Sequence, residues 1–210
     1  MIKKNWKVLT ITSIITLLPI FAGLLLWDQL PEQIPSHWNI AGEVDGWASK
    51  PVTVFGMPLL MVVILWFGVF AMMADPKKAE QSPKVLHLVL WIIPTLSVLL
   101  HTFVYMAAMG RELDVSMIMP VFMGLLFMVI GNYLPKCKQS YTVGIKLPWT
   151  LNSDENWHKT HRLAGRLWMV CGAVMMLTSL VGGFWIFLAA VLLMVAVPVA
   201  YSYYLYRKGI

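Results

Sequence analysis

Few side chains in this sequence have the types and spacing that chemistry requires, and most of them lie in two polar segments. His37, Glu43 and Asp45 carry the donor atoms of a metal site, although their spacing follows no established ligand pattern. In the second segment, His158 and His161 are three residues apart and can share one face of a helix. No third strong ligand accompanies this pair, so solvent-exposed histidines are the simpler interpretation. We expect neither a bound metal nor a cofactor.

Catalytic motifs are also missing from the sequence. We find no phosphate-binding P-loop, no nucleophile elbow and no HExxH pair of histidines. Cys137 and Cys171 fit neither a zinc pattern nor a disulfide framework, and we expect no disulfide between them. The sequence therefore gives no residue-level support for an enzyme.

Two further histidines, His87 and His101, lie within one apolar run. They are fourteen residues apart, which places them near one face of a helix. Ionisable side chains at membrane depth often have a function. No Asp or Glu lies in the middle of an apolar run to complete a proton or ion relay, and the role of these two histidines stays open.

The elements that must position these side chains are apolar enough to lie in a membrane. Hydrophobic residues make up 59% of the 210 residues and charged residues only 12%, whereas a soluble domain carries about 25% charged residues. A spanning helix needs about 20 mainly apolar residues, and lipid cannot satisfy unpaired backbone groups. We therefore expect an all-α integral membrane bundle of six transmembrane helices. The six apolar runs are Val8–Trp27, Thr53–Ala74, Val85–Met109, Ser116–Tyr133, Leu163–Val181 and Phe184–Tyr206.

The distribution of positive charge predicts which side of the membrane each loop faces. With six spans, 14 of the 16 lysines and arginines lie on one side, and only Lys50 and Arg111 lie on the other. Basic loops stay on the cytoplasmic side, so we expect both the N-terminus and the C-terminus in the cytoplasm. We expect two modules of three spans each, residues 1–110 and residues 111–210.

The N-terminal module holds an outer segment, residues 28–52, that is rich in tryptophan. Pro35 stiffens the backbone, and Gly42 and Asp45-Gly46 are turn signals. One interpretation is an interfacial loop whose tryptophans anchor at the lipid headgroups. The other is a contact surface for an extracellular or membrane-borne ligand. The residues of that surface would be His37, Trp38, Asn39, Asp45 and Trp47.

The C-terminal module holds a basic and aromatic inner segment, residues 135–162. Asn152 and Glu155 have the spacing of a capping box, which predicts a helix start at Asn152. Glu155 precedes Lys159 by four residues, the favourable order for an ion pair. The simpler interpretation of the charged side chains along this helix is a solvated face. Basic residues beside Trp149 and Trp157 also suit anionic lipid headgroups or an acidic protein surface.

Two long motifs in these segments resemble the SdpI family of bacterial immunity proteins. The outer one, Leu30 to Pro51, reads LPEQIPSHWNIAGEVDGWASKP. The inner one, Gly131 to Gly165, reads GNYLPKCKQSYTVGIKLPWTLNSDENWHKTHRLAG. They occur in the order expected of the family and cover both halves of the chain. The departures are small: Ser140, Lys146 and Leu147 stand where the family often has Asn, Arg and Thr.

The resemblance implies a multi-pass cell-membrane protein of a bacterium, typically Gram-positive, that gives immunity to a secreted, membrane-active toxin peptide. It also implies signal transduction, in which a cytoplasmic repressor protein is held at the membrane, without direct nucleic acid binding by this chain. The implied partners are thus the lipid bilayer, the toxin peptide and the repressor. The outer segment would meet the toxin, and the inner segment would meet the repressor. The inner contact residues would be Asn132, Tyr141, Lys146, Trp149, Trp157, His161 and Arg162.

A transporter or a flippase-like protein for a peptide, lipid or ion is the alternative hypothesis. It would use polar groups within the bundle, such as His87, His101 and Asn132. A polar, water-filled cavity would favour transport, whereas a bundle packed with Met, Leu and small residues would favour binding.

Overall fold

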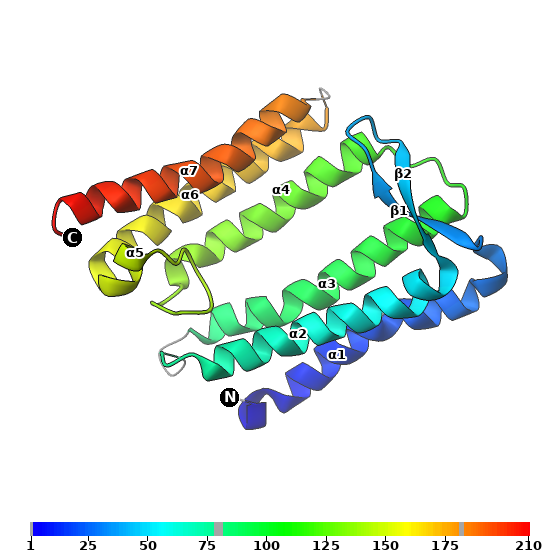
Figure 1. Ribbon diagram of the computed structural model, residues 1–210, viewed down its shortest axis with the longest axis horizontal. Coiled ribbons are helices and arrows are strands. Elements are labelled where there is room, and N and C mark those ends of the chain that lie inside the picture. Colours follow the sequence, from blue (N-terminus) through cyan, green and yellow to red (C-terminus); the bar gives the residue numbers. More distant parts are fainter. Residues whose placement is uncertain (1, 78–81, 181–182) are drawn as a thin grey trace. The chain divides into compact units, whose positions relative to one another are not determined.

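The computed structural model describes residues 2–77, 82–180 and 183–210, and most of these residues are helical (Figure 1). Lys78, which entered the charge count, and Val181, which ends a predicted span, lie outside this range. The chain forms two compact units, and each is described by itself. The first comprises Met1–Met73 and His87–Val115, and the second comprises Ala74–Leu86 and Ser116–Ile210. The long helices are α1 (Ile2–Leu25), α2 (Met57–Ala74), α3 (Pro83–Ala108), α4 (Val115–Tyr133), α6 (Asp154–Thr178) and α7 (Phe184–Arg207).

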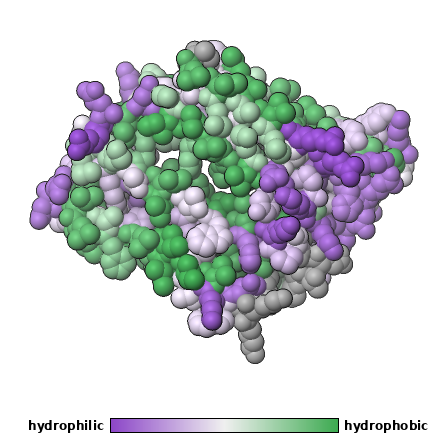
Figure 2. All heavy atoms as spheres, turned by 180° about the vertical axis from the view of Figure 1, so that it is seen from behind, coloured by the Kyte–Doolittle hydropathy of each residue, from purple (hydrophilic) through white to green (hydrophobic). Residues whose placement is uncertain are grey.

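Five helices in the described part of the chain are long and apolar enough to cross a membrane. They are Asn5–Leu25, Val52–Ala74, Pro83–Ala108, Val115–Lys136 and Phe184–Arg207, with mean hydropathies of 1.9 to 2.4. Large apolar side chains such as Leu25, Phe67 and Trp185 are exposed on them, and Figure 2 shows extensive hydrophobic areas on the molecular surface. This is a multi-pass membrane protein. The remaining predicted span, Leu163–Val181, overlaps α6, whose N-terminal half is charged. That α6 crosses the membrane stays a prediction.

The first unit joins its helices through buried polar groups as well as apolar contacts. The Ser97 hydroxyl donates to the Thr16 carbonyl oxygen at 2.8 Å, and the Tyr105 hydroxyl donates to the Pro19 carbonyl oxygen at 3.0 Å. Each bond ties α3 to α1 and satisfies a hydroxyl that lipid would leave unpaired. The His101 ring nitrogen Nδ1 lies 2.7 Å from the Ser97 carbonyl oxygen, in the same seam.

A β-hairpin follows α1 and the short 3₁₀ turn η1 (Trp27–Gln29). Its strands are β1 (Gln33–Trp38) and β2 (Val44–Ser49), which pair antiparallel from Gln33↔Ser49 to Trp38↔Val44. The all-α prediction is therefore right for most of the chain but omits this hairpin. A proline argues against a central strand, yet a two-stranded ribbon has only edge strands and tolerates Pro35. Gly42, with φ +81°, allows the turn. A π-helical turn, η2 (Val52–Gly56), then leads into α2.

The second unit is built on close helix packing. A Cβ atom on Gly124 of α4 would lie 2.5 Å from the Gly172 carbonyl oxygen of α6, and one on Gly172 would lie 2.5 Å from the Gly124 carbonyl oxygen. Gly131 and Gly165 repeat this reciprocal arrangement seven residues away, at 2.9 and 2.7 Å. Glycine at all four positions lets the two backbones touch.

The helices α6 and α7 form an antiparallel pair in this unit, lying side by side (Figure 1). The Trp168 indole donates to the Met194 carbonyl oxygen at 3.0 Å. Before α6, the inner segment contains the turn η4 (Leu134–Lys136), an irregular stretch and the short helix α5 (Pro148–Asn152). The predicted cap is wrong by one residue: Ser153 caps α6 by accepting from the Asn156 amide, because Asn152 ends α5. The predicted ion pair between Glu155 and Lys159 is confirmed at 2.7 Å.

Candidate functional site

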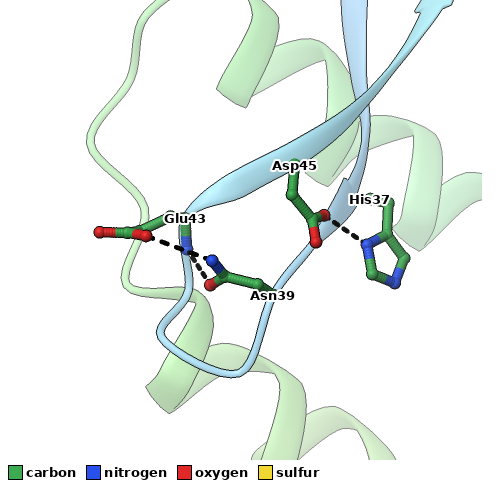
Figure 3. Close-up of polar contacts among 4 residues, drawn as sticks. All are labelled: His37, Asn39, Glu43 and Asp45. Atoms are coloured by element: carbon green, nitrogen blue, oxygen red, sulfur yellow. Dashed lines mark hydrogen bonds and ion pairs between the residues drawn. The ribbon is translucent and has the colours of Figure 1, made fainter.

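The outer hairpin presents a small set of polar side chains near its tip (Figure 3). His37 Nδ1 lies 2.5 Å from Asp45 Oδ1, across the two strands. Asn39 Oδ1 accepts from the Glu43 amide at 3.0 Å, and Asn39 Nδ2 donates to Glu43 Oε2 at 3.2 Å. The His37 side chain is 71% exposed, so the His37–Asp45 pair is open to a ligand.

The two hairpin tryptophans differ in their surroundings. Trp47 is 58% exposed. Trp38 is partly buried and meets the ring of Phe103 edge-on at 5.0 Å between centroids, which supports the hairpin against α3. Of the five predicted outer residues, Trp38 therefore has a packing role, and the other four lie together at or near the surface. No group of three or more His, Cys, Asp or Glu side chains within residues 2–77, 82–180 and 183–210 has the geometry of a metal site.

Lys50 is a feature of the outer segment that the sequence analysis missed. It is only 6% exposed. Its ammonium group lies 2.9 Å from a Glu32 carboxylate oxygen, donates to the Trp27 carbonyl oxygen at 3.2 Å and lies 5.0 Å from the Trp27 ring centroid. This lysine fixes the base of the hairpin to the end of α1.

Trp157 and His161 of the inner segment lie in the interior rather than on a surface. They are 0% and 1% exposed, and their rings stack at 4.0 Å between centroids. His161 Nδ1 donates to the Trp157 carbonyl oxygen at 2.8 Å, while Nε2 accepts from the Ile145 amide at 2.9 Å. One donor and one acceptor define a neutral imidazole. Burial lowers the pKa of His161 to about 4, and His158 acts in the same direction.

The irregular stretch passes so close to this pair that it requires glycine. Gly144 has φ +121°, and a Cβ there would lie 2.6 Å from His161 Nε2 and 2.7 Å from the Trp157 ring. The Trp157 indole donates to the Cys137 carbonyl oxygen at 2.9 Å. Trp157 and His161 thus form the support on which the inner segment folds, and any partner would meet the residues around them.

Trp149 belongs to an aromatic cluster at the end of α7. Its indole donates to the Ser202 hydroxyl at 2.9 Å, and its ring stacks on Tyr206 with 5.8 Å between centroids. An open pocket of about 420 Å³ lies beside it. The pocket is lined by Pro148, Trp149, Asn152, Ser153, Tyr206, Gly209 and Ile210. This arrangement can accept an apolar or aromatic side chain of a partner.

The remaining inner candidates are exposed. Asn132 accepts from the Lys136 ammonium group at 3.3 Å, and Lys146 donates to the Thr142 carbonyl oxygen at 3.2 Å. Tyr141 is 51% exposed, and Arg162 is also at the surface. Exposed positive charge and a phenol ring suit an acidic partner.

The sequence analysis also missed a buried carboxylate, Asp75, directly after α2. It is 3% exposed and accepts hydrogen bonds from the stretch Ser140–Thr142. Burial works to raise its pKa, but the hydrogen bonds outweigh burial and lower it. The only signal in the sequence is an acid at the end of an apolar run, which also fits a solvated helix end.

Comparison with known proteins gives a family match in the C-terminal half of the chain and a similar protein over its full length. The SdpI/YfhL protein family model matches residues 136–202, which cover the inner segment, α6 and most of α7. The immunity protein SdpI of Bacillus subtilis (strain 168) is 27% identical over 209 residues, 98% of this chain and 97% of that protein. Residues 136–202 thus match the SdpI/YfhL family, and the whole chain is similar to an immunity protein. This confirms the resemblance seen in the sequence motifs.

A second family model covers part of the N-terminal half of the chain. It is a domain of unknown function, DUF1648, and it matches residues 14–62, from α1 through the hairpin into α2. No solved structure matches the chain. Both polar segments described above thus fall within regions that the two family models recognise.

Proposed function

We propose that this protein gives resistance to a secreted, membrane-active toxin peptide and relays the presence of that peptide by holding a cytoplasmic repressor at the membrane. The observation that carries the proposal is the full-length similarity to an immunity protein, over 98% of one chain and 97% of the other. A match of this extent includes both polar segments and every long helix.

The topology we propose has six spans, with α6 as the fifth in order, and both termini in the cytoplasm. The charge bias supports it, because 14 of 16 basic residues then lie on the cytoplasmic side. A reporter enzyme fused after Ile210 and active only in the cytoplasm is expected to be active. Activity of an exported-only reporter at the same position would contradict this topology.

The outer hairpin is the proposed toxin-binding element. It is a short, ordered platform that exposes Trp47 together with the His37–Asp45 pair. An amphipathic peptide at the membrane surface has both apolar and charged groups, which a tryptophan beside an ion pair can meet. Trp47→Ala is expected to reduce protection against the cognate toxin.

The inner surface is the proposed repressor-binding element. Lys146 and Arg162 supply exposed positive charge, and the pocket beside Trp149 supplies an apolar recess. Such a combination of a pocket and surrounding charge is typical of protein recognition.

Deleting the gene and exposing the cells to the cognate toxin tests immunity, and unchanged sensitivity would remove that part of the proposal. Charge reversal at Lys146 or Arg162 tests the relay: we expect the repressor to leave the membrane while resistance persists. Lys208→Glu reverses a charge at the end of α7 and serves as the matched control.

The transporter hypothesis has less support in the geometry. His87 is at the surface of α3, and His101 is bonded to a backbone carbonyl within the first unit. Asn132 bonds to a lysine at an exposed position. These three side chains are thus accounted for without a transport path.

A further inference from the structure

The Asp75 carboxylate is surrounded by hydrogen-bond donors from a distant part of the chain. Its Oδ2 accepts from the Ser140 hydroxyl at 2.6 Å, the Tyr141 amide at 2.9 Å, and the Thr142 amide and hydroxyl at 3.1 and 2.9 Å. Its Oδ1 accepts from the Lys77 amide at 2.8 Å. Within residues 2–77, 82–180 and 183–210, five donors therefore converge on this buried carboxylate.

No cation is paired with this carboxylate among the residues that the structure describes. Lys77, whose backbone amide bonds to this carboxylate, donates its ammonium group to the Gln139 side-chain oxygen instead. A buried negative charge that is held only by neutral donors is stable only while those donors stay aimed at it. The arrangement is therefore sensitive to any displacement of Asp75 from the loop.

The donor loop, Ser140–Val143, depends on the carboxylate in turn. Ser140 Oγ accepts from the Thr142 and Val143 amides at 3.1 and 3.2 Å. These bonds form a tight turn, from which the other donors reach Asp75. The loop has no helix or strand to pair its amides. Without Asp75, the Tyr141 amide would lose its described partner and the Thr142 amide would keep only Ser140 Oγ. Unpaired backbone donors are costly.

The same loop connects the two halves of the inner segment. On one side, Cys137 is 4% exposed and its carbonyl oxygen accepts from the Trp157 indole. On the other side, the Ile145 amide donates to His161. Gln139 closes the loop by donating to the Thr150 carbonyl oxygen at 2.9 Å. Holding the loop therefore holds the whole segment against α6.

We propose that Asp75 is a latch: its carboxylate is the anion around which the loop Ser140–Val143 folds, and it keeps the inner segment closed over Trp157 and His161. One peptide bond joins Asp75 to Ala74, the last residue of α2. A movement at the end of α2 would withdraw the carboxylate from its donors and free the inner segment. Its consequence for the repressor rests on the proposed function, whereas the latch itself does not.

The chain supplies its own reporter for this latch. It has only two cysteines, and both are buried. Cys171→Ala leaves Cys137, which is buried within the inner segment against Trp157. Cys137→Ala leaves Cys171, which packs between α6 and α7 with Met175. The measurement is the rate of alkylation by N-ethylmaleimide in membrane vesicles, at one fixed pH. Asp75→Ala is compared with Asp154→Ala, which removes the same charge from an exposed position in the same unit.

If the latch exists, Asp75→Ala raises the alkylation rate of Cys137 by about tenfold or more, since labelling follows the population of the open state. Asp154→Ala should leave that rate within about twofold of the parent, and the rate of Cys171 should change with neither variant. Equal rates for Cys137 in the two variants would overturn the latch. So would equal acceleration of both cysteines, because Asp75 would then support the whole fold and not one segment.

A double-mutant comparison tests whether the donors act through Asp75. Thr142→Val removes one hydroxyl donor and should raise the Cys137 rate by less than Asp75→Ala does. The double variant should label no faster than Asp75→Ala alone, since both changes remove the same interaction. If the two changes instead multiplied the alkylation rate of Cys137 independently, the proposed contact between Thr142 and Asp75 would be contradicted.

The relay provides a separate readout. We expect Asp75→Ala to lose membrane retention of the repressor and to keep resistance to the toxin. Loss of both, with Cys171 still protected, would show that the latch also serves immunity and would overturn its restriction to the inner segment. If the parent protein itself holds no repressor, the proposed relay fails, while the alkylation result still decides the latch.

Discussion

The outer hairpin and the inner segment use similar residues in opposite ways. Both contain tryptophan, histidine and charged side chains, and both were predicted as contact surfaces. In the hairpin, Trp47 and His37 are exposed and make few contacts with the rest of the fold. In the inner segment, Trp157 and His161 are almost fully buried and hold a loop in place. Residue type alone therefore does not separate a binding surface from the support beneath one.

The difference comes from what surrounds each segment. The hairpin obtains its order from its own backbone pairing, so its side chains are free to face outward. The irregular inner stretch has no ladder, and its amides find partners in the side chains of Asp75 and His161. A segment without regular structure must use its polar side chains for folding before they can serve binding.

The largest difference in stability between the two segments is expected when one tryptophan in each is replaced by alanine. Trp157→Ala should destabilise the second unit by about 3–5 kcal/mol, because it empties a fully buried site. Trp47→Ala should change stability by less than about 0.5 kcal/mol, since the ring is exposed. Denaturation of the purified protein in detergent measures both. Similar losses for the two variants would break the comparison.

A smaller effect is expected from a methyl group at the closest helix contact. Gly172→Ala places a Cβ 2.5 Å from the Gly124 carbonyl oxygen and should cost about 1–3 kcal/mol through overpacking. Gly68→Ala in α2 is the matched control, because a Cβ there meets nothing within 4 Å. It should be neutral or stabilising by up to about 1 kcal/mol. Thermal unfolding of both variants measures the two changes in stability. A Gly172→Ala protein as stable as the parent would contradict the close packing of α4 against α6.

Acid is expected to loosen the inner segment in two steps. The pKa of His161 falls from 6.5 to about 4 in the folded protein, so its neutral form contributes fully above pH 6.5 and loses its contribution as pH drops toward 4. The lowered pKa of Asp75 means that its contribution is present above about pH 4 and is lost below that, through its folded pKa. His161→Gln should remove the first step and leave the second. Trp fluorescence against pH measures both, and an unchanged first step in His161→Gln would exclude His161 as its source.

The smallest effect on stability is expected at the His37–Asp45 pair of the outer hairpin. Asp45→Asn should change stability by no more than about 1 kcal/mol, as for other exposed ion pairs. A change in toxin protection without a change in stability would support the binding role of the hairpin. A large loss of stability would instead give the hairpin the same supporting role as the inner segment.

The sequence predicted the helices far better than the contacts between distant segments. Long apolar runs leave few alternatives in lipid, and five of them form helices long enough to span. The hairpin was missed because Pro35 argues against a strand in any but an edge position. The helix cap was displaced by one residue because Pro148 starts a separate short helix that ends at Asn152.

The Asp75 contact could not have been predicted from local patterns. Its donors on Ser140, Tyr141 and Thr142 lie 65 or more residues away, and neither the acid nor the loop has a periodic signal. Likewise, the spacing of His158 and His161 suggested equivalent residues, yet one is exposed and the other is 1% exposed. What distinguishes His161 is its long-range surroundings: the Ile145 amide donates to its ring and Gly144 lies against it.

The paired glycines of α4 and α6 also limit how these helices can move. With carbonyl oxygens facing glycine at two levels, turning either helix about its own axis would drive the adjoining side chains, such as Met128 or Met176, into the opposing backbone. We therefore expect the two helices to shift together more readily than either turns by itself. A shift of α4 would then be passed to α6, where the inner segment is attached.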